Sequence, residues 1–416
     1  MVTVFGLGFV GLTTALGFAH MGYKVYGIDV DENRKATLRK GELPFFEPHM
    51  DEVLNEHLNK NFFVTDDVKE AVKNSDFLFF CVGTPYGVDG SADLTYLFSA
   101  LDTALDCIED DKFRVVVTKS TIPPSTTSEK IYPYVKSKGE KAAHIGVANN
   151  PEFLREGYCW DDFIHADRIV LGCNDEISKK MLTDLYEPLQ VPIKCVSHNT
   201  GEFIKYLSNT LLATMISYSN EMAQVADTIG DIEIADAFKI LHMDRRWGGC
   251  NMKSYVYPGC GYGGYCLPKD TNALLAQSRE KGYEPAILKE VIAVNDNMAD
   301  TISKKIIKAL PDERKDACIG ILGLAFKPGS DDVRDTPAAR IIRKLQEKGY
   351  GNIIAYDPVA QAEFARVYPE LDIEMCPDRK TICEKASVLV ITTAWEEFRD
   401  IMEETNSKVI DCRYML

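Results

Sequence analysis

Three glycines near the start of the chain limit its fold more than any other feature. Gly6, Gly8 and Gly11 stand between an apolar segment at 2–5 and a helix-like segment at 12–20. The first glycine permits a tight turn, the second lets the backbone approach a pyrophosphate, and the third lets strand and helix pack closely. The N-terminus of the helix also offers N–H groups to phosphates. The spacing therefore predicts a dinucleotide-binding turn, whose contact residues are Gly6, Gly8, Val10 and Gly11.

An acidic residue stands where such a turn requires one. Asp29 follows a second predicted strand at 24–28. Its carboxylate can accept hydrogen bonds from a ribose diol and would repel a 2′-phosphate, so we expect NAD rather than NADP. Arg34 leaves this choice partly open. It could meet a 2′-phosphate if the carboxylate turned away, or it could be a solvated helix residue.

The size and charge of the chain exclude several classes of protein. Its 416 residues carry 47 Lys and Arg against 63 Asp and Glu, a formal charge of −16. This acidic balance speaks against non-specific binding to nucleic acid, which needs a basic face. No apolar run reaches the roughly 18 residues that a membrane span requires. The length predicts two or three domains, at about 150 residues each.

The order of apolar segments divides the chain into three parts. Strand-like and helix-like segments alternate up to about residue 195 and again from about residue 316, which is typical of parallel, doubly wound sheets. The part between them is helix-like throughout. We therefore predict an α/β fold with two Rossmann-like doubly wound domains, at 1–195 and 301–416. A long central helix and a helical dimerisation domain, at 196–300, join them.

The central part begins with one unusually long apolar helix. Residues 202–229 contain no proline and place apolar side chains at helical spacing over about seven turns. One small domain cannot easily cover so long an apolar face. We therefore expect the helix to pack against its copy in a homodimer or a higher homo-oligomer.

A glycine-rich loop between Pro258 and Asp270 carries a candidate nucleophile. Four of the six residues from 259 to 264 are glycine, and such a loop lets its backbone come close to a ligand. Cys266 follows the loop, and Lys269 with Asp270 opens a predicted helix. A helix N-terminus and a nearby lysine both favour a thiolate, which can capture an aldehyde. Cys260, in the same loop, is the competing cysteine.

The other cysteines and the histidines give no sign of a metal site. The chain has 12 cysteines and 7 histidines, without any C-x-x-C, H-x-x-H or H-x-x-x-H pair, so zinc binding has no support in their spacing. Met1 leads straight into a predicted strand, which leaves no room for a signal peptide. We therefore expect a cytoplasmic protein with reduced thiols.

These residues together make the sequence resemble the UDP-glucose/GDP-mannose dehydrogenase family, and within it the UDP-glucose 6-dehydrogenases. The likeness extends over essentially the whole chain and rests on motifs that occur in the same order. They are Gly6–Gly11, Gly83-Thr84-Pro85, Lys119-Ser120-Thr121, Asn150–Gly157, Lys205 with Asn209, the Cys266 loop, and Gly323–Pro328 with Arg334.

The resemblance implies a four-electron oxidation at C6 of a nucleotide sugar, which consumes two NAD and yields a uronate. UDP-glucose is the favoured substrate and UDP-glucuronate the product. A GDP-mannose 6-dehydrogenase or another nucleotide-sugar dehydrogenase stays open, because the segment 246–266 is longer than is usual in UDP-glucose enzymes. A two-electron hydroxyacid dehydrogenase and an NAD-binding regulator are more remote, since neither needs Cys266 after a glycine-rich loop.

The resemblance also implies catalytic roles. Cys266 would hold the aldehyde-level carbon, while Lys205 and Asn209, four apart on one helix face, would stabilise the oxyanion. Water positioning and proton transfer would fall to Asp270, Thr121 and Glu156. Two of these assignments have plainer alternatives. Lys205 and Asn209 could be solvated helix residues, and Glu156 could be a surface acid.

The same resemblance implies two sets of binding residues. Besides the glycine turn, the cofactor contacts are Asp29, Arg34, Thr84, Thr121, Glu156 and Arg334. The substrate contacts are Glu152, Phe153, Leu154, Arg155, Glu156, Lys205, Asn209, Arg246, Tyr257, Gly261, Tyr262, Gly263, Cys266, Lys327 and Arg413. Arg246 matches an arginine that reaches the nucleotide phosphates in the neighbouring subunit, and Arg413 is a weaker match. Glu152, like Glu156, could instead lie on a helix surface.

Overall fold

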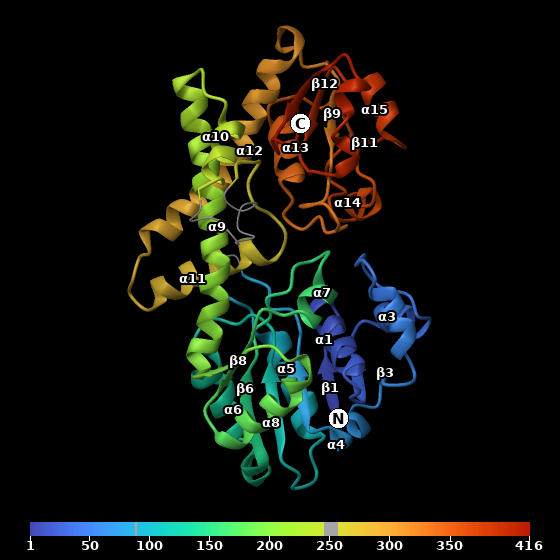
Figure 1. Ribbon diagram of the computed structural model, residues 1–416, viewed down its shortest axis with the longest axis vertical. Helices are drawn as coiled ribbons and strands as arrows, with labels where there is room; N and C mark the ends of the chain where they lie inside the picture. The colour runs from blue at the N-terminus through green and yellow to red at the C-terminus, as the bar shows by residue number, and fades with distance from the viewer. Residues whose placement is uncertain (88–89, 245–256) are drawn as a thin grey trace. The chain divides into compact units, whose positions relative to one another are not determined.

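The computed structural model describes residues 1–87, 90–244 and 257–416. The chain forms two compact units, Met1–Ser208 and Asn209–Leu416 (Figure 1). Each unit contains its own sheet, and each is considered by itself below. The helix α9, His198–Ile229, begins in the first unit and continues into the second.

The first unit is built on an eight-stranded sheet in the order β3-β2-β1-β4-β5-β6-β7-β8. The first six positions follow the strand order of a dinucleotide-binding fold, so this prediction is confirmed. All neighbouring strands are parallel except β6 and β7, which are antiparallel. The strands are β1 Val2–Phe5, β2 Val25–Ile28, β3 Phe62–Val64, β4 Phe77–Phe80, β5 Arg114–Thr118, β6 Ile145–Asn149, β7 Ile169–Cys173 and β8 Ile193–Val196.

Helices surround this sheet (Figure 1). They are α1 Phe9–His20, α2 Glu32–Arg39, α3 Met50–His57, α4 Val68–Asn74, α5 Thr95–Asp106, α6 Tyr132–Lys136, α7 Cys159–Ile164 and α8 Glu176–Tyr186. A short π-helix at Thr127–Ile131 precedes α6. A π-helical turn inside a chain of α-helical elements is uncommon and often marks a functional region.

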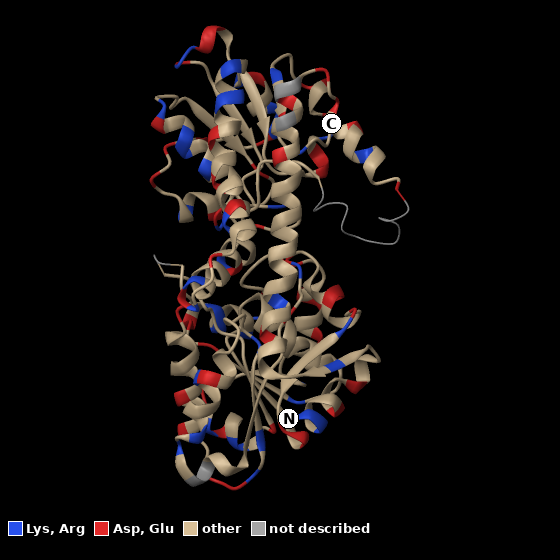
Figure 2. Ribbon diagram, turned by 90° about the vertical axis from the view of Figure 1, so that its left-hand side faces the viewer, with Lys and Arg blue, Asp and Glu red and all other residues tan. Residues whose placement is uncertain are grey.

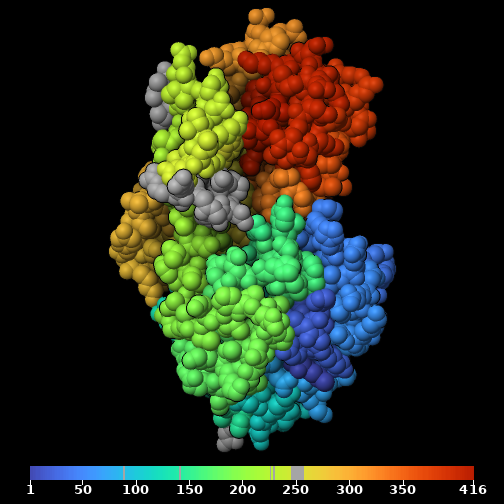
Figure 3. All heavy atoms as spheres, in the orientation of Figure 1, coloured from blue at the N-terminus to red at the C-terminus, as the bar shows by residue number. Residues whose placement is uncertain are grey.

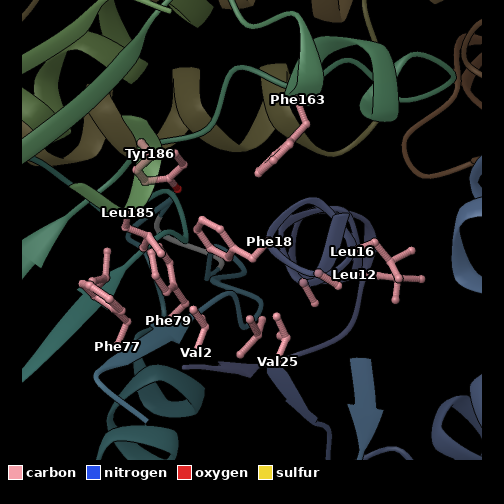
Figure 4. Packing of buried hydrophobic residues seen from close by; sticks show 14 of the residues in the cluster. Val2, Leu12, Leu16, Phe18, Val25, Phe77, Phe79, Phe163, Leu185 and Tyr186 are labelled. Atoms are coloured by element: carbon pink, nitrogen blue, oxygen red, sulfur yellow. The ribbon is translucent and has the colours of Figure 1, made fainter. Parts of the chain in front are cut away.

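The core of the first unit holds α1 against the sheet. Phe18 of α1 points toward Phe79, Phe163 and Tyr186, with ring centroids 5.0, 6.0 and 5.3 Å away (Figure 4). A Cβ at Gly17 would lie 2.1 Å from the ring of Phe163, so only glycine allows this close approach. The packing fixes the direction of α1 and therefore the position of the glycine turn at its start.

The second unit combines helices with a five-stranded parallel sheet in the order β11-β10-β9-β12-β13. Its strands are β9 Ile319–Leu322, β10 Ile353–Tyr356, β11 Glu374–Met375, β12 Val388–Ile391 and β13 Lys408–Asp411. Its helices after α9 are α10 Ile234–Leu241, α11 Cys266–Glu280, α12 Ala286–Ala309, α13 Pro337–Glu347, α14 Gln361–Val367 and α15 Arg379–Lys385. The predicted helical middle and second α/β sheet are thus both present.

The two sheets share one local device at their first strand. Gly6 after β1 and Gly323 after β9 both have positive φ, at 87° and 95°. The residue after each glycine donates its N–H to a buried carboxylate at the end of the neighbouring strand: Leu7 to Asp29 at 2.6 Å, and Leu324 to Asp357 at 2.7 Å. The same bond therefore shapes both strand-to-helix turns.

The surface is mixed in charge. Figure 2 shows acidic and basic residues interspersed along the outer helices, whereas the strands are largely uncharged. Within the described part of the chain, every helix is too short or too polar to cross a bilayer.

Candidate active site

The glycine turn has the geometry that a pyrophosphate site needs. A Cβ at Gly6 would lie 2.8 Å from the carbonyl oxygen of Cys81, and one at Gly11 would lie 1.8 Å from the carbonyl oxygen of Gly6. A Cβ at Gly8, in contrast, would meet no atom within 4 Å. Two glycines are thus required by the protein's own packing, while Gly8 faces open space.

The helix that follows leaves its N-terminus available to an anion. Helix α1 begins at Phe9 next to Val10, and no side chain caps it. Its first turn contains no acidic residue. Uncapped N–H groups and the positive end of the helix dipole suit a phosphate. The residues present therefore fit the pyrophosphate of a dinucleotide.

Asp29 accepts hydrogen bonds from the backbone at the glycine turn, and it is also the candidate acceptor for the ribose hydroxyls. Its side chain is 2% exposed. Besides the bond from Leu7, it accepts one from the N–H of Asp31 at 2.8 Å. Arg34 Nη1 lies 2.9 and 3.1 Å from its two oxygens. Arg34 is therefore paired with Asp29. This pairing does not decide whether Arg34 meets a 2′-phosphate or is a solvated helix residue.

Thr84 and Thr121 come together at the carboxyl ends of β4 and β5. Thr84 is buried, and its hydroxyl donates to the carbonyl oxygen of Thr121 at 2.7 Å. Ser120 next to it donates to the carbonyl oxygen of Val82 at 2.6 Å. The loop with Thr121 is thus fixed to the loop with Thr84, and Thr121 itself stays partly exposed.

A buried ion pair lies at the end of β6. Lys205 Nζ on α9 is 2.8 Å from Glu152 Oε1, and each side chain is only 6% exposed. Glu152 Oε2 also accepts the N–H of Leu154 at 2.7 Å. Burial alone would raise the pKa of Glu152, but the Lys205 ammonium, the N–H of Leu154 and the charge of Lys119 together outweigh it, and the pKa is lowered. Glu152 is therefore an anion that orients Lys205, in a loop and not on a helix surface.

A third charged group, from the Lys119-Ser120-Thr121 motif but without a role assigned from the sequence, lies near this pair. Lys119 is buried, and its Nζ donates to Asn150 Oδ1 at 2.9 Å. Burial lowers the pKa of Lys119 to about 8, and its charge helps to lower the pKa of Glu152. Two lysines thus lie near the Glu152 carboxylate, and their positive charges favour its ionised form. A lysine directly after the buried strand β5 was the signal in the sequence.

The rest of this loop has mixed surroundings. Phe153 makes cation–π contacts: the Arg168 guanidinium lies 4.1 Å and Lys205 Nζ 5.6 Å from its ring centre. Leu154 packs against the core of the unit. Arg155 is half exposed and pairs with Asp162 at 2.6 Å. Glu156 is partly buried in the turn that follows.

In the second unit, Cys266 is the first residue of α11, so the helix begins earlier than its predicted start at Asp270. Asp270 is fully buried and accepts two hydrogen bonds, from Asn209 Nδ2 at 2.6 Å and from Lys269 Nζ. Burial alone would lower the pKa of Lys269. The charge and hydrogen bond of Asp270, together with the charge of the Cys266 thiolate form, outweigh this and raise the pKa of Lys269. The cysteine thus lies at a helix N-terminus beside a charged lysine, where a thiolate is favoured.

The glycines of the loop before Cys266 serve internal packing. A Cβ at Gly263 would lie 2.3 Å from the carbonyl oxygen of Asp335, and one at Gly264 would lie 2.9 Å from the ring of Phe326. Gly264 also donates its N–H to the carbonyl oxygen of Arg334 at 2.9 Å. We expected the loop backbone to approach a ligand, but at these two glycines the neighbouring atoms belong to the protein.

Asn295 of α12 fixes the middle of the loop. A Cβ at Gly261 would lie 2.7 Å from Asn295 Oδ1. The same amide exchanges bonds of 2.8 and 3.1 Å with the backbone of Tyr262. The Tyr262 ring is buried in an apolar cluster with Ala213 and Val291. Tyr262 thus anchors the loop to α9 and α12.

Cys260 lies in a different environment from Cys266. Its side chain belongs to the apolar core of the second unit, and its thiol donates to the carbonyl oxygen of Thr392 at 3.4 Å. Arg413 Nη1 is 3.8 Å from its sulfur. Tyr257 lies nearby along the chain, with its hydroxyl 3.4 Å from the carbonyl oxygen of Tyr414.

Two further predicted residues follow β9. Lys327 Nζ lies 5.3 Å from the ring centre of Phe326. Arg334 pairs with Asp332 at 2.6 Å and stacks over the ring of Tyr265, 4.6 Å from its centre. Arg334 therefore lies directly beside the residue before Cys266. Arg246 lies outside the described residues.

Comparison with known proteins gives the same family over all three parts of the chain. Residues 1–190 match the NAD binding domain of the UDP-glucose/GDP-mannose dehydrogenase family, residues 199–297 its central domain and residues 320–416 its UDP binding domain. The match to an NAD binding domain agrees with the expected cofactor.

Similar individual proteins carry related names. A UDP-glucose 6-dehydrogenase of Rhizobium meliloti is 36% identical over 96% of this chain and 90% of its own length. One of Haloferax volcanii is 33% identical over 97% and 93%. A solved UDP-glucose dehydrogenase of Pyrobaculum islandicum covers 100% of this chain and 94% of its own, at 33% identity and a TM-score of 0.90. The chain belongs to the UDP-glucose/GDP-mannose dehydrogenase family.

Proposed function

We propose that this protein oxidises C6 of UDP-glucose to the carboxylate of UDP-glucuronate, with two NAD and a covalent intermediate on Cys266. The observation that carries the proposal is the buried Asn209–Asp270–Lys269 group at the start of the helix that Cys266 opens. Relatives named UDP-glucose 6-dehydrogenase, at 33–36% identity over nearly the whole chain, support the choice of sugar nucleotide.

The glycine turn and Asp29 would hold the cofactor, together with Thr84, Thr121, Glu156 and Arg334. NAD, when bound there, would accept one hydride from C6 in each of the two oxidations. Arg34 would keep its pairing with Asp29 while the carboxylate accepts a ribose hydroxyl.

The chain's own residues would carry the covalent and proton-transfer steps. Glu156 takes the proton of the C6 hydroxyl in the first oxidation, which leaves an aldehyde. The thiolate of Cys266 adds to the aldehyde carbon, and Lys205 and Asn209 stabilise the oxyanion that forms. Loss of the second hydride turns this thiohemiacetal into a thioester. Water positioned by Asp270 and Thr121 then adds, the thiolate leaves, and the uronate remains.

Two of the proposed catalytic side chains, Lys205 and Asp270, are buried and held in place by other polar side chains. Lys205 is held in place by Glu152, and Asp270 by Asn209 and Lys269. Polar groups that are already oriented stabilise a developing charge without rearranging. Lys327, Tyr257, Arg246 and Arg413 would bind the nucleotide and the sugar, together with the 152–156 loop and Gly261–Gly263.

The active form would be a homodimer in the cytoplasm. Along α9 the large apolar side chains Phe203, Leu211 and Tyr218 are 44–53% exposed. At 100° per residue, these positions fall within about 80° of the helix circumference. An apolar stripe of this kind favours packing against a second copy. The cytoplasm would keep the thiol of Cys266 reduced.

The stoichiometry of reduction tests the reaction. Two NADH formed per UDP-glucose consumed, with UDP-glucuronate as product, would support it. One NADH would indicate a two-electron dehydrogenase, and none a binding protein. Parallel assays with GDP-mannose and UDP-acetamido sugars test the sugar, since preferred turnover of GDP-mannose would replace UDP-glucose as the substrate.

A further inference from the structure

Two histidines that are 37 residues apart in the sequence meet in the first unit, where His20 is exposed and His57 is buried. His20 Nδ1 lies 3.2 Å from His57 Nε2. Glu56 Oε2 is 3.9 Å from the same His57 nitrogen, and the three potential ligand atoms lie within 4.8 Å of one another. Glu56 is largely exposed, so its carboxylate can move toward the ring nitrogens.

The spacing of the ring nitrogens suits a shared metal ion. Two Zn–N bonds of about 2.0–2.1 Å at a tetrahedral angle separate the nitrogens by about 3.3 Å. Two ring nitrogens at 3.2 Å cannot both carry a proton toward each other, so at least one lone pair faces the gap. Imidazole and carboxylate together make a donor set for Zn²⁺ and similar divalent ions.

The helices that carry these residues add a second reason for a cation. His20 is the last residue of α1, and His57 is the last residue of α3. The C-terminal end of a helix carries a partial negative charge, which stabilises a nearby cation. Two such ends meet here, with the Glu56 carboxylate beside them. Lys60, in contrast, places a positive charge near His57, and this charge disfavours a bound cation.

We propose that His20, His57 and Glu56 form a Zn²⁺ site, with water as the fourth ligand, that ties α1 to α3. This site is separate from the proposed chemistry, because the glycine turn lies at the other end of α1. The 12 residues of α1 place these ends about 18 Å apart. The bound ion would therefore stabilise the first unit and would not act on substrate.

Trp160 gives this site an optical reporter. Its indole lies edge-on to His20, with ring centroids 5.4 Å apart. It belongs to α7, which packs beside α1, and in Figure 3 this green segment borders the blue N-terminal segment. A Co²⁺ ion bound between the histidines should quench the fluorescence of Trp160 and show a visible absorption band that Zn²⁺ removes by competition.

The experiment uses the tag-free, full-length protein after dialysis against a chelator. We expect one Zn²⁺ per chain by calorimetry and a rise in the melting temperature with added Zn²⁺. His20→Ala is the first variant, since His20 is exposed and its removal should not disturb folding. It should lose at least about tenfold in Zn²⁺ affinity and lose both the melting shift and the Co²⁺ quenching.

Three further variants separate the outcomes. His165→Ala is the matched control, because His165 is an exposed histidine beside Asp161 and should leave binding unchanged. Trp160→Phe should lose the Co²⁺ quenching but keep Zn²⁺ binding. Lys60→Met should tighten binding. Equal binding by His20→Ala and the wild type, or no binding by the wild type, would overturn the site and leave an ordinary histidine–histidine hydrogen bond.

Discussion

Asn209 and Asp270 are 61 residues apart in the sequence, and Asn209 Nδ2 donates a 2.6 Å hydrogen bond to Asp270 Oδ2. The other carboxylate oxygen of Asp270 accepts from Lys269, so the acid is shared between an amide and a buried cation. The bond joins α9 to the start of α11, the helix that Cys266 opens.

Replacing Asp270 should therefore affect stability as well as activity. Asp270→Asn would leave the Lys269 ammonium buried without its carboxylate, at a cost of about 3 kcal/mol in the free energy of unfolding. Adding Lys269→Met should recover much of this stability but not the activity. Urea denaturation together with uronate assays checks both parts. A single variant as stable as the wild type would contradict the argument.

The two cysteines of the glycine-rich loop should respond differently to substitution. Cys266→Ala should abolish uronate formation and turnover of added 6-aldehyde, because no thiol remains to hold the carbon. Cys260→Ala should keep most of the activity and lose some stability, since Cys260 is a core residue. Uronate production by the two variants is the measurement, and the opposite pattern would show that the nucleophile is Cys260.

Alkylation of the wild type should label Cys266 first, with bound substrate protecting it. Burial raises the pKa of most other described thiols and keeps them protonated, namely Cys81, Cys107, Cys159, Cys173, Cys318, Cys376, Cys383 and Cys412. Mass mapping of the first labelled peptide decides this, and primary labelling elsewhere would count against Cys266 as the reactive thiol.

Asp29 should control the choice of cofactor together with Arg34. Asp29→Ala should lower kcat/KM for NAD at least about tenfold and narrow the preference over NADP, because Arg34 would be released toward a 2′-phosphate. Asp29→Ala with Arg34→Ala should lose the NADP use again. Steady-state rates with both cofactors test this, and equal wild-type turnover with NAD and NADP would refute the role of Asp29.

Stability should depend on pH through Glu202 of α9. Glu202 Oε1 accepts the N–H of Thr127 at 2.6 Å, and burial raises the pKa of this carboxyl to about 7. The folded protein therefore holds a proton that the unfolded chain has already lost. The contribution of Glu202 is complete below about pH 4.5 and disappears as the pH rises through 7.

Glu202→Gln should remove this part of the pH dependence and gain up to about 3 kcal/mol relative to the wild type at pH 8. Chemical denaturation between pH 5 and 8.5, in about half-unit steps, gives the two curves. Glu52→Gln, at an exposed position of α3, is the control and should follow the wild type. Parallel curves for Glu202→Gln and the wild type would rule out the effect.

A charge on the exposed face of α9 should separate the proposed dimer. Leu211 is 47% exposed, and Leu211→Glu would place a carboxylate into the apolar contact. Sedimentation velocity should show monomers of this variant and dimers of the wild type, with loss of activity in the monomer. Asp227→Asn, at an exposed position of the same helix that lies outside the 80° stripe, is the control. A monomeric wild type at active concentrations would contradict the dimer.

The strongly patterned elements were predictable from the sequence, and weakly patterned ones were not. The glycine turn, the first two strands and the long α9 follow from spacing alone. Strand β8, Ile193–Val196, was missed because it is short and only half buried. The antiparallel pairing of β7 with β6 was also missed, because the sequence of a short apolar strand does not specify the direction in which the strand runs.

The candidate site was predictable as a set of residues but not as contacts. Cys266, Asp270 and Lys205 stand out through their neighbours in the sequence. Their partners come from distant segments, as the pairing of Lys205 with Glu152 shows. Lys119 was named only as part of a motif, and neither it nor Glu202 was given a role, because the role of these charged residues depends on their burial, which the sequence does not show.

The turns after β1 and β9 have the same backbone bond but differ in how closely a ligand can approach them. Gly6-Leu7-Gly8-Phe9 and Gly323-Leu324-Ala325-Phe326 differ only at their third position. Gly8 faces open space, whereas Ala325 is 1% exposed, with its N–H 3.1 Å from Asp357. At the third position of the second turn, a single methyl group therefore occupies the place that Gly8 leaves open in the first turn, so a phosphate could approach the backbone of the first turn at a point where the second is filled.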